Sequence, residues 1–138
     1  MMHLTRFGVS MEDELLKLFD QYIQQEGYKN RSEALRDLIR QCFVKDEWQK
    51  NAVVAGVILL VYNHHKRELV DKLLDMAHDF QSLIICTQHV HLDHDNCLET
   101  IVVKGKARSI QELHDRIKAC KGVKHVALSM TTTGEKIV

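Results

Sequence analysis

The sequence predicts an α+β protein built from two small units, because the spacing of its apolar residues changes once along the chain. The N-terminal part shows one short segment of alternating apolar residues, followed by two segments with helical spacing. From Val53 onward the pattern becomes strand, helix, strand, strand, helix and strand. The expected units are a strand–helix–helix unit over residues 1–48 and a βαββαβ unit over residues 49–138.

The predicted N-terminal strand, residues 4–10, has no partner within its own unit. Phe7 and Val9 fall on one face of this strand, and the residues between them fall on the other. A lone strand cannot form a ladder, and a unit of about 50 residues buries too little apolar surface to be stable alone. Antiparallel pairing of the strands of two copies solves both problems, so the sequence predicts an obligate, intertwined dimer.

Capping residues mark the two helices of this unit. Ser10 is the expected N-cap of the first helix, and Gly27 ends that helix because glycine readily adopts the left-handed conformation. Asn30 opens the second helix, with Glu33 three residues later in a capping box. The polar segment Asp46–Asn51 is a linker or an extension of this second helix.

The C-terminal unit has the element order of the ferredoxin-like arrangement. Both helices of such a fold cover one face of an antiparallel sheet, and the other face meets water or a partner. The strands are apolar enough to expect cover on both faces, which predicts a second association surface and, with the N-terminal dimer, a tetramer. The expected strands are Val53–Tyr62, Leu83–His91, Cys97–Lys104 and Val123–Met130, the helices are Lys66–Phe80 and Ser109–Cys120 with a Ser109–Glu112 capping box, and the apolar strand residues include Val57, Leu59, Val61, Ile101 and Val103.

Charge and composition restrict the function. The formal net charge is zero, so any DNA binding must come from a few well-placed contacts rather than from a basic surface. No apolar run reaches the roughly 18 residues of a membrane span, and the N-terminus lacks a signal peptide, so we expect a cytoplasmic protein without a membrane partner. The four cysteines lack the spacing of a disulfide scaffold and are packing residues, metal ligands or reactive thiols.

Two histidines and a cysteine form the clearest chemical pattern. His89 and His91 end a predicted strand and point to the same side of it, and Cys97 opens the next strand after a short turn. Two imidazoles and a thiolate suit a late transition metal, and tetrahedral zinc would accept the same donors. His78, near the end of the preceding helix, is the candidate fourth ligand, donated across a subunit interface. The other histidines are interpreted as surface or packed residues: His64, His65, His94, His114 and His125.

The outward face of the paired N-terminal strands is a candidate DNA-reading surface. A two-stranded ribbon fits the major groove, and arginine reads guanine through two hydrogen bonds. The start of the second helix offers backbone N–H groups and a cation to a phosphate. The alternative is a ribbon that serves only dimerisation. The residues with these expected roles are Arg6, Gly8 and Ser10 on the ribbon and Asn30, Arg31 and Ser32 at the helix start.

Glu33 and Asp37 lie four residues apart on one helix face. Their carboxylates could bind a hard cation through oxygen atoms. The alternative is a solvated face beside Arg36 and Arg40, so both interpretations stay open on the spacing alone.

Taken together, these residues resemble the family of nickel-responsive transcriptional regulators, in which a ribbon-helix-helix domain is joined to an ACT-like regulatory domain. The resemblance covers nearly the whole chain, from Arg6 to about Gly134. Four segments carry it: residues 27–37 (GYKNRSEALRD), 61–64 (VYNH), 89–99 (HVHLDHDNCLE) and 121–125 (KGVKH).

The resemblance implies a homotetramer, a dimer of dimers, with the regulatory domains at its centre and a DNA-binding dimer on each flank. It implies one square-planar Ni²⁺ per subunit, and it makes Glu99 and Tyr62 residues that orient the ligands. The implied ligands are His89, His91 and Cys97 of one subunit and His78 of the partner subunit.

The resemblance also implies a repressor, of nickel uptake genes, that binds a double-stranded DNA operator. It matches Arg6, Gly8 and Ser10 to DNA-reading positions, and Glu33 and Asp37 to a secondary cation site. Gly8 departs from the family pattern, in which a hydroxyl side chain is usual at that position, and this departure puts one base contact in question.

Two other functions compete with this interpretation. A metal-dependent enzyme would keep an open coordination position beside an acid or base, whereas four protein ligands would close the site, so we expect no enzyme. An ACT-type regulator of a small organic effector would have a glycine-rich loop between the first strand and helix of the second unit, where this chain has residues 63–66 (NHHK).

Overall fold

The computed structural model describes residues 2–138, which divide into two compact units. The first unit extends to Ile39 and the second runs from Arg40 to Val138, so the division falls inside a helix. That helix, α2 (Arg31–Gln49), continues through residue 48, where the sequence places the boundary between two functional domains. No helix among residues 2–138 combines the length and apolarity that a membrane crossing requires.

The first unit contains helix α1 (Asp13–Glu26) and the beginning of α2. Gly27 has a φ of 75° and closes α1 in the left-handed conformation, as predicted. The backbone N–H of Glu33 donates to Asn30 Oδ1 at 2.9 Å, which confirms Asn30 as the start of α2. The predicted cap of α1 is wrong: Glu12 rather than Ser10 precedes the helix, and no side chain caps it.

Residues 4–10 do not form a strand in the single chain. The prediction of a strand depended on a ladder partner, and the first unit supplies no second extended segment to pair with. Phe7 and Val9 therefore stay 69% and 61% exposed, and Ala34 is the only buried residue described in this unit. The unit lacks an apolar core of its own, which is the condition that led us to expect a dimer.

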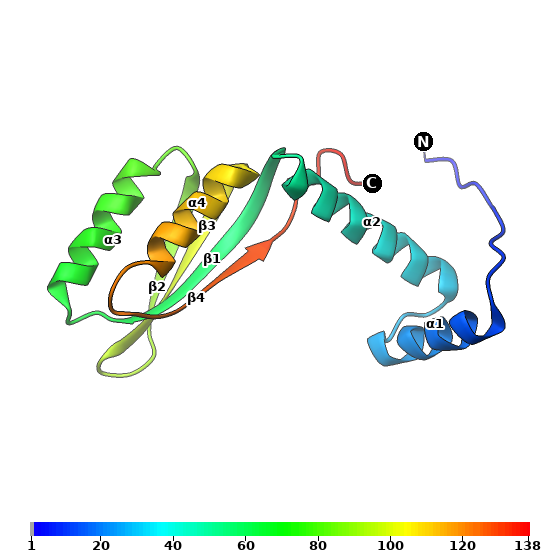
Figure 1. The fold of residues 1–138 in the computed structure, drawn as a ribbon, viewed down its shortest axis with the longest axis horizontal. Coiled ribbons are helices and arrows are strands. Elements are labelled where there is room, and N and C mark those ends of the chain that lie inside the picture. Colours follow the sequence, from blue (N-terminus) through cyan, green and yellow to red (C-terminus); the bar gives the residue numbers. More distant parts are fainter. Residues whose placement is uncertain (1) are drawn as a thin grey trace. The chain divides into compact units, whose positions relative to one another are not determined.

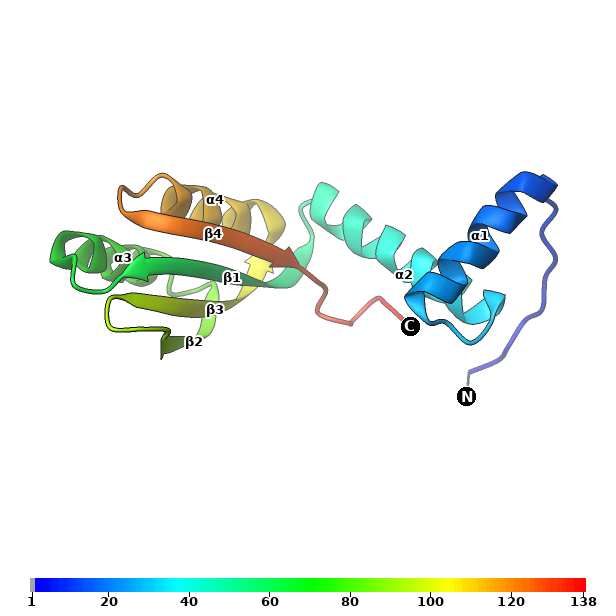
Figure 2. The same cartoon turned by 90° about the horizontal axis from the view of Figure 1, so that it is seen from below.

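The second unit is a four-stranded sheet with two helices, α3 (Arg67–Asp79) and α4 (Ala107–Lys118), on the same side of it (Figure 1). The strands follow one another across the sheet in the order β2-β3-β1-β4, and each neighbouring pair is antiparallel (Figure 2). This is the predicted ferredoxin-like arrangement. The strands are β1 (Val53–Asn63), β2 (Ile84–His91), β3 (Asn96–Lys106) and β4 (Val123–Met130).

The start of α4 differs from the prediction. The helix begins at Ala107, directly after β3, and Lys106 occupies the N-cap position without a side-chain hydrogen bond. Ser109 therefore lies within the first turn and cannot serve as the N-cap of a Ser109–Glu112 capping box. Strand β3 also runs two residues further than the apolar pattern indicates, which leaves no loop for a capping residue.

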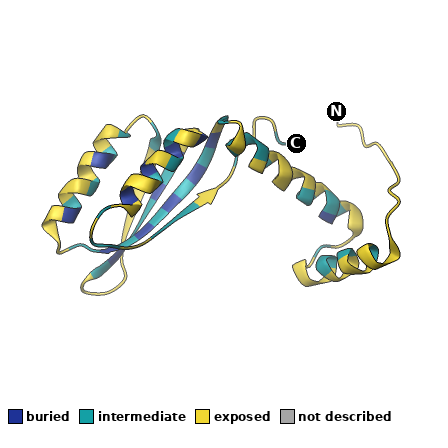
Figure 3. Ribbon diagram, viewed as in Figure 1, coloured by how far each residue is buried: buried dark blue, intermediate teal, exposed yellow. Residues whose placement is uncertain are grey.

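The core lies between the sheet and its two helices. Buried and half-buried residues alternate along β1, so every second side chain points toward the helices (Figure 3). Val54, Ile58 and Leu60 are fully buried there, against Ile110 and other residues of α4. The helices thus supply the cover for one face of the sheet.

The second face of the sheet carries fewer of the predicted residues than we expected. Ile101 and Val103 pair with Ile58 and Gly56, so they lie on the helix-covered face and are buried within the single chain. Val57, Leu59 and Val61 point to the opposite face and are only half-buried. The uncovered face also carries Leu98 and Val102 of β3, which pair with Val61 and Val57, so its apolar residues come from more than one strand.

Segment 131–138 fixes the C-terminal half of α2 to the sheet within the second unit. Thr131 N donates to Ala55 O at 3.0 Å and continues the ladder beyond β4. Trp48 Nε1 then donates to Thr131 O at 2.8 Å, and Thr132 Oγ1 donates to Glu47 Oε1 at 2.8 Å. The last turns of α2 are anchored by these bonds.

Candidate metal centre

Strand register brings the predicted metal ligands onto one face of the sheet. Cys97 of β3 pairs with Tyr62 on one side and with His91 on the other, and Glu99 pairs with His89 in the adjacent row. Directly paired residues point to the same face, so these five side chains come from three neighbouring strands and share the helix-covered face. Because β2 ends at His91 and β3 begins at Asn96, these residues lie at the end of the sheet where the β2–β3 hairpin turns, a turn that Figure 1 shows.

The donors are near one another but do not close a site within one chain. The rings of His89 and His91 lie 5.2 Å apart, both are exposed, and Cys97 is fully buried with its thiol donating to Tyr62 O at 3.4 Å. Over residues 2–138, the only three His, Cys, Asp or Glu donors within 4.8 Å of one another belong to a different cluster. The ligand set of His89, His91 and Cys97 would need side-chain rotation and a further donor.

Tyr62 and Glu99 form a hydrogen-bonded pair next to His89. The Tyr62 hydroxyl donates to Glu99 Oε2 at 2.8 Å and lies 3.5 Å from His89 Nδ1. Burial, reinforced by the Glu99 carboxylate, raises the pKa of Tyr62, so the phenol keeps its proton and remains a donor. This pair can hold the imidazole of His89 in one orientation. Residues that are hydrogen-bonded to metal ligands commonly orient those ligands in this way.

The donor set fits a late transition metal. Two imidazoles and one thiolate favour nickel, copper or zinc over magnesium or calcium, which prefer oxygen ligands. Burial raises the pKa of the Cys97 thiol above its ordinary value, and a metal ligand must be the thiolate. Without a cation nearby, Cys97 therefore stays a protonated thiol that packs in the core.

His78 lies apart from these residues within the chain. It occupies the last turn of α3 and its side chain is exposed. An exposed imidazole on a helix end is accessible from outside the chain, and its role as a ligand for a second subunit stays a prediction.

The predicted DNA-reading residues are exposed on the N-terminal segment. Arg6, Gly8 and Ser10 all lie outside any helix or strand of the single chain. A Cβ placed on Gly8 would meet nothing within 4 Å, so the chain itself does not require glycine at this position. Nothing within the chain explains why residue 8 is a glycine.

The start of α2 is engaged within the chain. Arg31 makes two 2.9 Å hydrogen bonds to the carboxylate of Asp20, and the Arg31 guanidinium lowers the pKa of that carboxyl. Asn30 accepts its capping bond, and the Ser32 side chain is exposed. A phosphate at this helix would have to compete with Asp20 for Arg31.

The carboxylates of Glu33 and Asp37 also have partners. The Tyr28 hydroxyl donates to Asp37 Oδ2, and this carboxylate raises the pKa of Tyr28. Lys29 N donates to Glu33 Oε2 at 3.4 Å. Sequence reasoning missed Tyr28, although it stands in the GYKNRSE segment, because no spacing rule links a residue before a helix to one two turns inside it.

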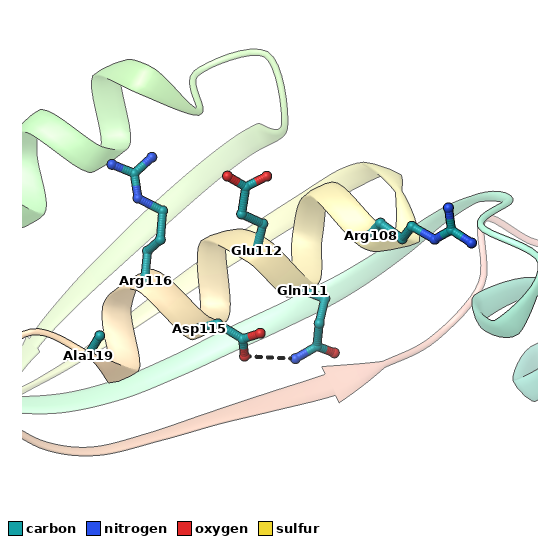
Figure 4. A pocket seen from close by; sticks show the side chains of 6 residues that line it. All are labelled: Arg108, Gln111, Glu112, Asp115, Arg116 and Ala119. Atoms are coloured by element: carbon teal, nitrogen blue, oxygen red, sulfur yellow. Dashed lines mark hydrogen bonds between the residues drawn. The ribbon is translucent and has the colours of Figure 1, made fainter.

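A shallow hollow on α4 shares no residue with the candidate metal centre. Its volume is about 420 Å³, and Figure 4 shows Gln111 and Asp115, one turn apart on α4, pointing toward each other and joined by a 3.0 Å hydrogen bond. The hollow contains no histidine or cysteine. The lining residues are Arg108, Gln111, Glu112, Asp115, Arg116 and Ala119.

Comparison with known proteins assigns both parts of the chain. Residues 55–131 match the NikR C terminal nickel binding domain, and residues 5–42 match the ribbon-helix-helix protein, copG family. The chain also resembles the structure of an uncharacterized protein from Thermotoga maritima, with a TM-score of 0.52 at 14% identity, covering 56% of this chain and 96% of that chain. At this identity the likeness concerns the fold alone.

Full-length relatives agree with these matches. A nickel-responsive regulator of Chlorobium phaeobacteroides is 52% identical over 132 residues, which cover 96% of this chain and 98% of that protein. A regulator of the same name from Thermococcus onnurineus is 51% identical over 138 residues, covering 99% and 100%. The two domain matches and these relatives indicate a regulator rather than an enzyme. The chain belongs to the family of nickel-responsive regulators.

Proposed function

We propose that this protein is a nickel-dependent, sequence-specific DNA-binding repressor of nickel uptake genes, acting in the cytoplasm. Residues 1–48 would bind DNA and dimerise, and residues 49–138 would form the ACT-like metal-binding and tetramerisation domain. The observation that carries the proposal is the strand register that puts His89, His91 and Cys97 on one face beside Tyr62 and Glu99.

Each subunit is proposed to bind one Ni²⁺. His89, His91 and Cys97 supply three ligands and His78 of the partner subunit supplies the fourth. Tyr62 and Glu99 orient the imidazole of His89 through the hydrogen bonds described above. When bound, nickel would supply a link between two subunits at the end of α3.

The assembly is proposed to be a homotetramer, a dimer of dimers. In the first unit, a hollow of about 500 Å³ beside the exposed N-terminal segment, lined by both apolar and polar residues, suits the same segment of a second copy. In the second unit, the half-buried face of the sheet around Val57, Leu59 and Val61 suits a second association surface. The hollow is lined by Phe7, Val9, Ser10, Met11, Leu16, Phe19, Arg31, Ser32 and Leu35.

The paired N-terminal segments are proposed to read the major groove of a double-stranded operator. Arg6 and Ser10 supply base contacts, and Gly8 leaves room for a base pair to approach the backbone. The start of α2 would hold a phosphate of the DNA. Arg31 would break its hydrogen bonds to Asp20 and bind the phosphate instead. The residues proposed for this contact are Asn30, Arg31 and Ser32.

Glu33 and Asp37 are proposed to form a secondary cation site on α2. Two carboxylates one helical turn apart offer oxygen ligands to a hard cation. The Tyr28 hydroxyl, which already donates to Asp37, would hold that carboxylate in place.

Regulation follows if His78 reaches the metal centre only in the DNA-competent arrangement of subunits. A ligand shifts an equilibrium only through its different affinity for the two states, and the imidazole of His78 would provide that difference. The ligand set favours nickel over an organic effector, because an organic effector would give no function to the row of His91, Cys97 and Tyr62.

The test is a DNA-binding assay on the full chain. The probe is a duplex selected from a random-sequence pool by the nickel-loaded protein, titrated with and without one equivalent of nickel or zinc per subunit. We expect nickel to tighten binding by about 5- to 150-fold, the usual range of allosteric coupling. Transcription from a promoter that carries the selected site should fall in parallel. Equal affinity with and without nickel would rule out a nickel-dependent regulator of DNA binding.

A further inference from the structure

A second cluster of donors lies where two loops of the regulatory unit meet. His64 and His65 belong to the loop between β1 and α3, whereas His94 and Asp95 belong to the turn between β2 and β3. The two loops are joined by their backbones, since His64 N donates to Asp95 O at 3.2 Å. None of these residues is a ligand of the proposed nickel centre.

Three of these side chains converge on one point. Donor atoms of His65, His94 and Asp95 all lie within 4.8 Å of one another. His65 Nε2 lies 3.6 Å from Asp95 Oδ1, and the rings of His65 and His94 lie 5.2 Å apart. Two imidazoles and one carboxylate at this separation surround a volume that a single cation could occupy, and all three side chains are open to solvent.

Both loops are held in this shape by the chain itself. Asp93 Oδ1 accepts hydrogen bonds from the N–H groups of Asp95 and Asn96 at 2.9 and 2.7 Å. Asn63 Oδ1 accepts one from His65 N at 2.9 Å. Because the backbone on each side is already fixed, a cation would have to order only the side chains and replace the 3.0 Å contact between His65 Nε2 and His94 O, which limits the entropic cost of binding. This distinguishes the cluster from exposed charged groups that meet by chance.

We propose that His65, His94 and Asp95 form an accessory site for a divalent late transition metal, separate from the cysteine-containing centre. Imidazole and carboxylate ligands suit zinc, cobalt or nickel, and water completes the coordination of so exposed a site. The bound cation joins the β1–α3 loop to the β2–β3 turn. Since that turn connects His91 to Cys97, and the ring of His64 lies 4.7 Å from the ring of His91, the accessory cation stiffens the hairpin that carries the main ligands.

Cobalt separates the two sites by spectroscopy, because only the centre with Cys97 can give a thiolate-to-metal charge-transfer band. The experiment is a titration of the full-length chain with Co²⁺ and Zn²⁺, followed by absorption and by equilibrium dialysis. For the wild type we expect two equivalents per subunit, the second without charge transfer. A Cys97→Ser variant should keep one equivalent with d–d bands only, which makes the result independent of the fate of the proposed nickel centre.

The accessory equivalent should depend on its own ligands. Asp95→Asn should weaken it by at least about tenfold, and Cys97→Ser combined with His65→Ala should remove it, because loss of even an outer-shell partner costs about 10- to 100-fold. His125→Ala, which removes an exposed histidine elsewhere on β4, is the matched control and should change nothing. The proposal is overturned if Cys97→Ser binds no cobalt, or if Asp95→Asn and the combined variant bind it as tightly as Cys97→Ser alone.

Discussion

Replacing Cys97 with serine is expected to lower the affinity of the regulator for nickel by more than about 100-fold. Loss of an outer-shell partner alone costs about 10- to 100-fold, and Cys97 is proposed as a direct ligand and the only sulfur donor. Serine keeps the volume and the hydrogen bond to Tyr62 O, so the fold should survive. Competition titration against a nickel chelator measures the change, and the nickel-dependent increase in DNA affinity should disappear with it.

Cys86 provides the control for this experiment. It lies on β2, in the same hairpin, but its side chain is exposed and outside the row of Tyr62, Cys97 and His91. Cys86→Ser should therefore bind nickel like the wild type. If Cys97→Ser retained wild-type nickel affinity, the thiolate would have no place in the centre, and the donor set would have to be sought elsewhere.

Replacing Arg6 with alanine is expected to abolish specific DNA binding while leaving nickel binding unchanged. A bidentate arginine–guanine pair contributes about 1–3 kcal/mol of discrimination, and each paired ribbon presents two copies of Arg6. The two substitutions in one ribbon should then together lower the free energy of discrimination at one operator half by about 2–6 kcal/mol. Fluorescence anisotropy with the selected duplex and with an unrelated duplex measures it, and the difference between the two probes should collapse.

Lys17 is a suitable control because it is also an exposed cation of the first unit, on α1. Lys17→Ala should lower affinity for both duplexes slightly and equally, as expected for a charge without base contacts. A ribbon used only for dimerisation predicts a different outcome, in which Arg6→Ala and Lys17→Ala behave alike.

Much of the fold follows from periodicity. The predicted order of strands and helices in the second unit is correct, because the apolar residues of each element recur at the spacing of a strand or a helix. This spacing arises because each element is covered on one side, as β1 is by α4. Gly27 and Asn30 were found because their roles depend on local backbone geometry alone. The start of α4 was missed because β3 continues directly into the helix at Ala107, and an apolar pattern does not register such a junction.

Other features could not follow from one chain. The strand over residues 4–10 needs a ladder partner that a single copy does not contain, and the burial of Ile101 depends on a register that no local pattern fixes. The candidate ligands His89, His91 and Cys97 were recognisable by their spacing. The pair His65 and Asp95 was not, because its members are thirty residues apart in sequence and meet only through the contact of two loops.

The most direct test of this account is a crystal structure of the full chain loaded with one equivalent of nickel per subunit, with the metal located by anomalous scattering at the nickel edge. The account predicts one strong peak per subunit, in contact with nitrogens of His89 and His91, the sulfur of Cys97 and a nitrogen from His78 of the partner subunit. A peak whose ligands exclude Cys97, or imidazoles of His89 and His91 turned away from the ion, would contradict it.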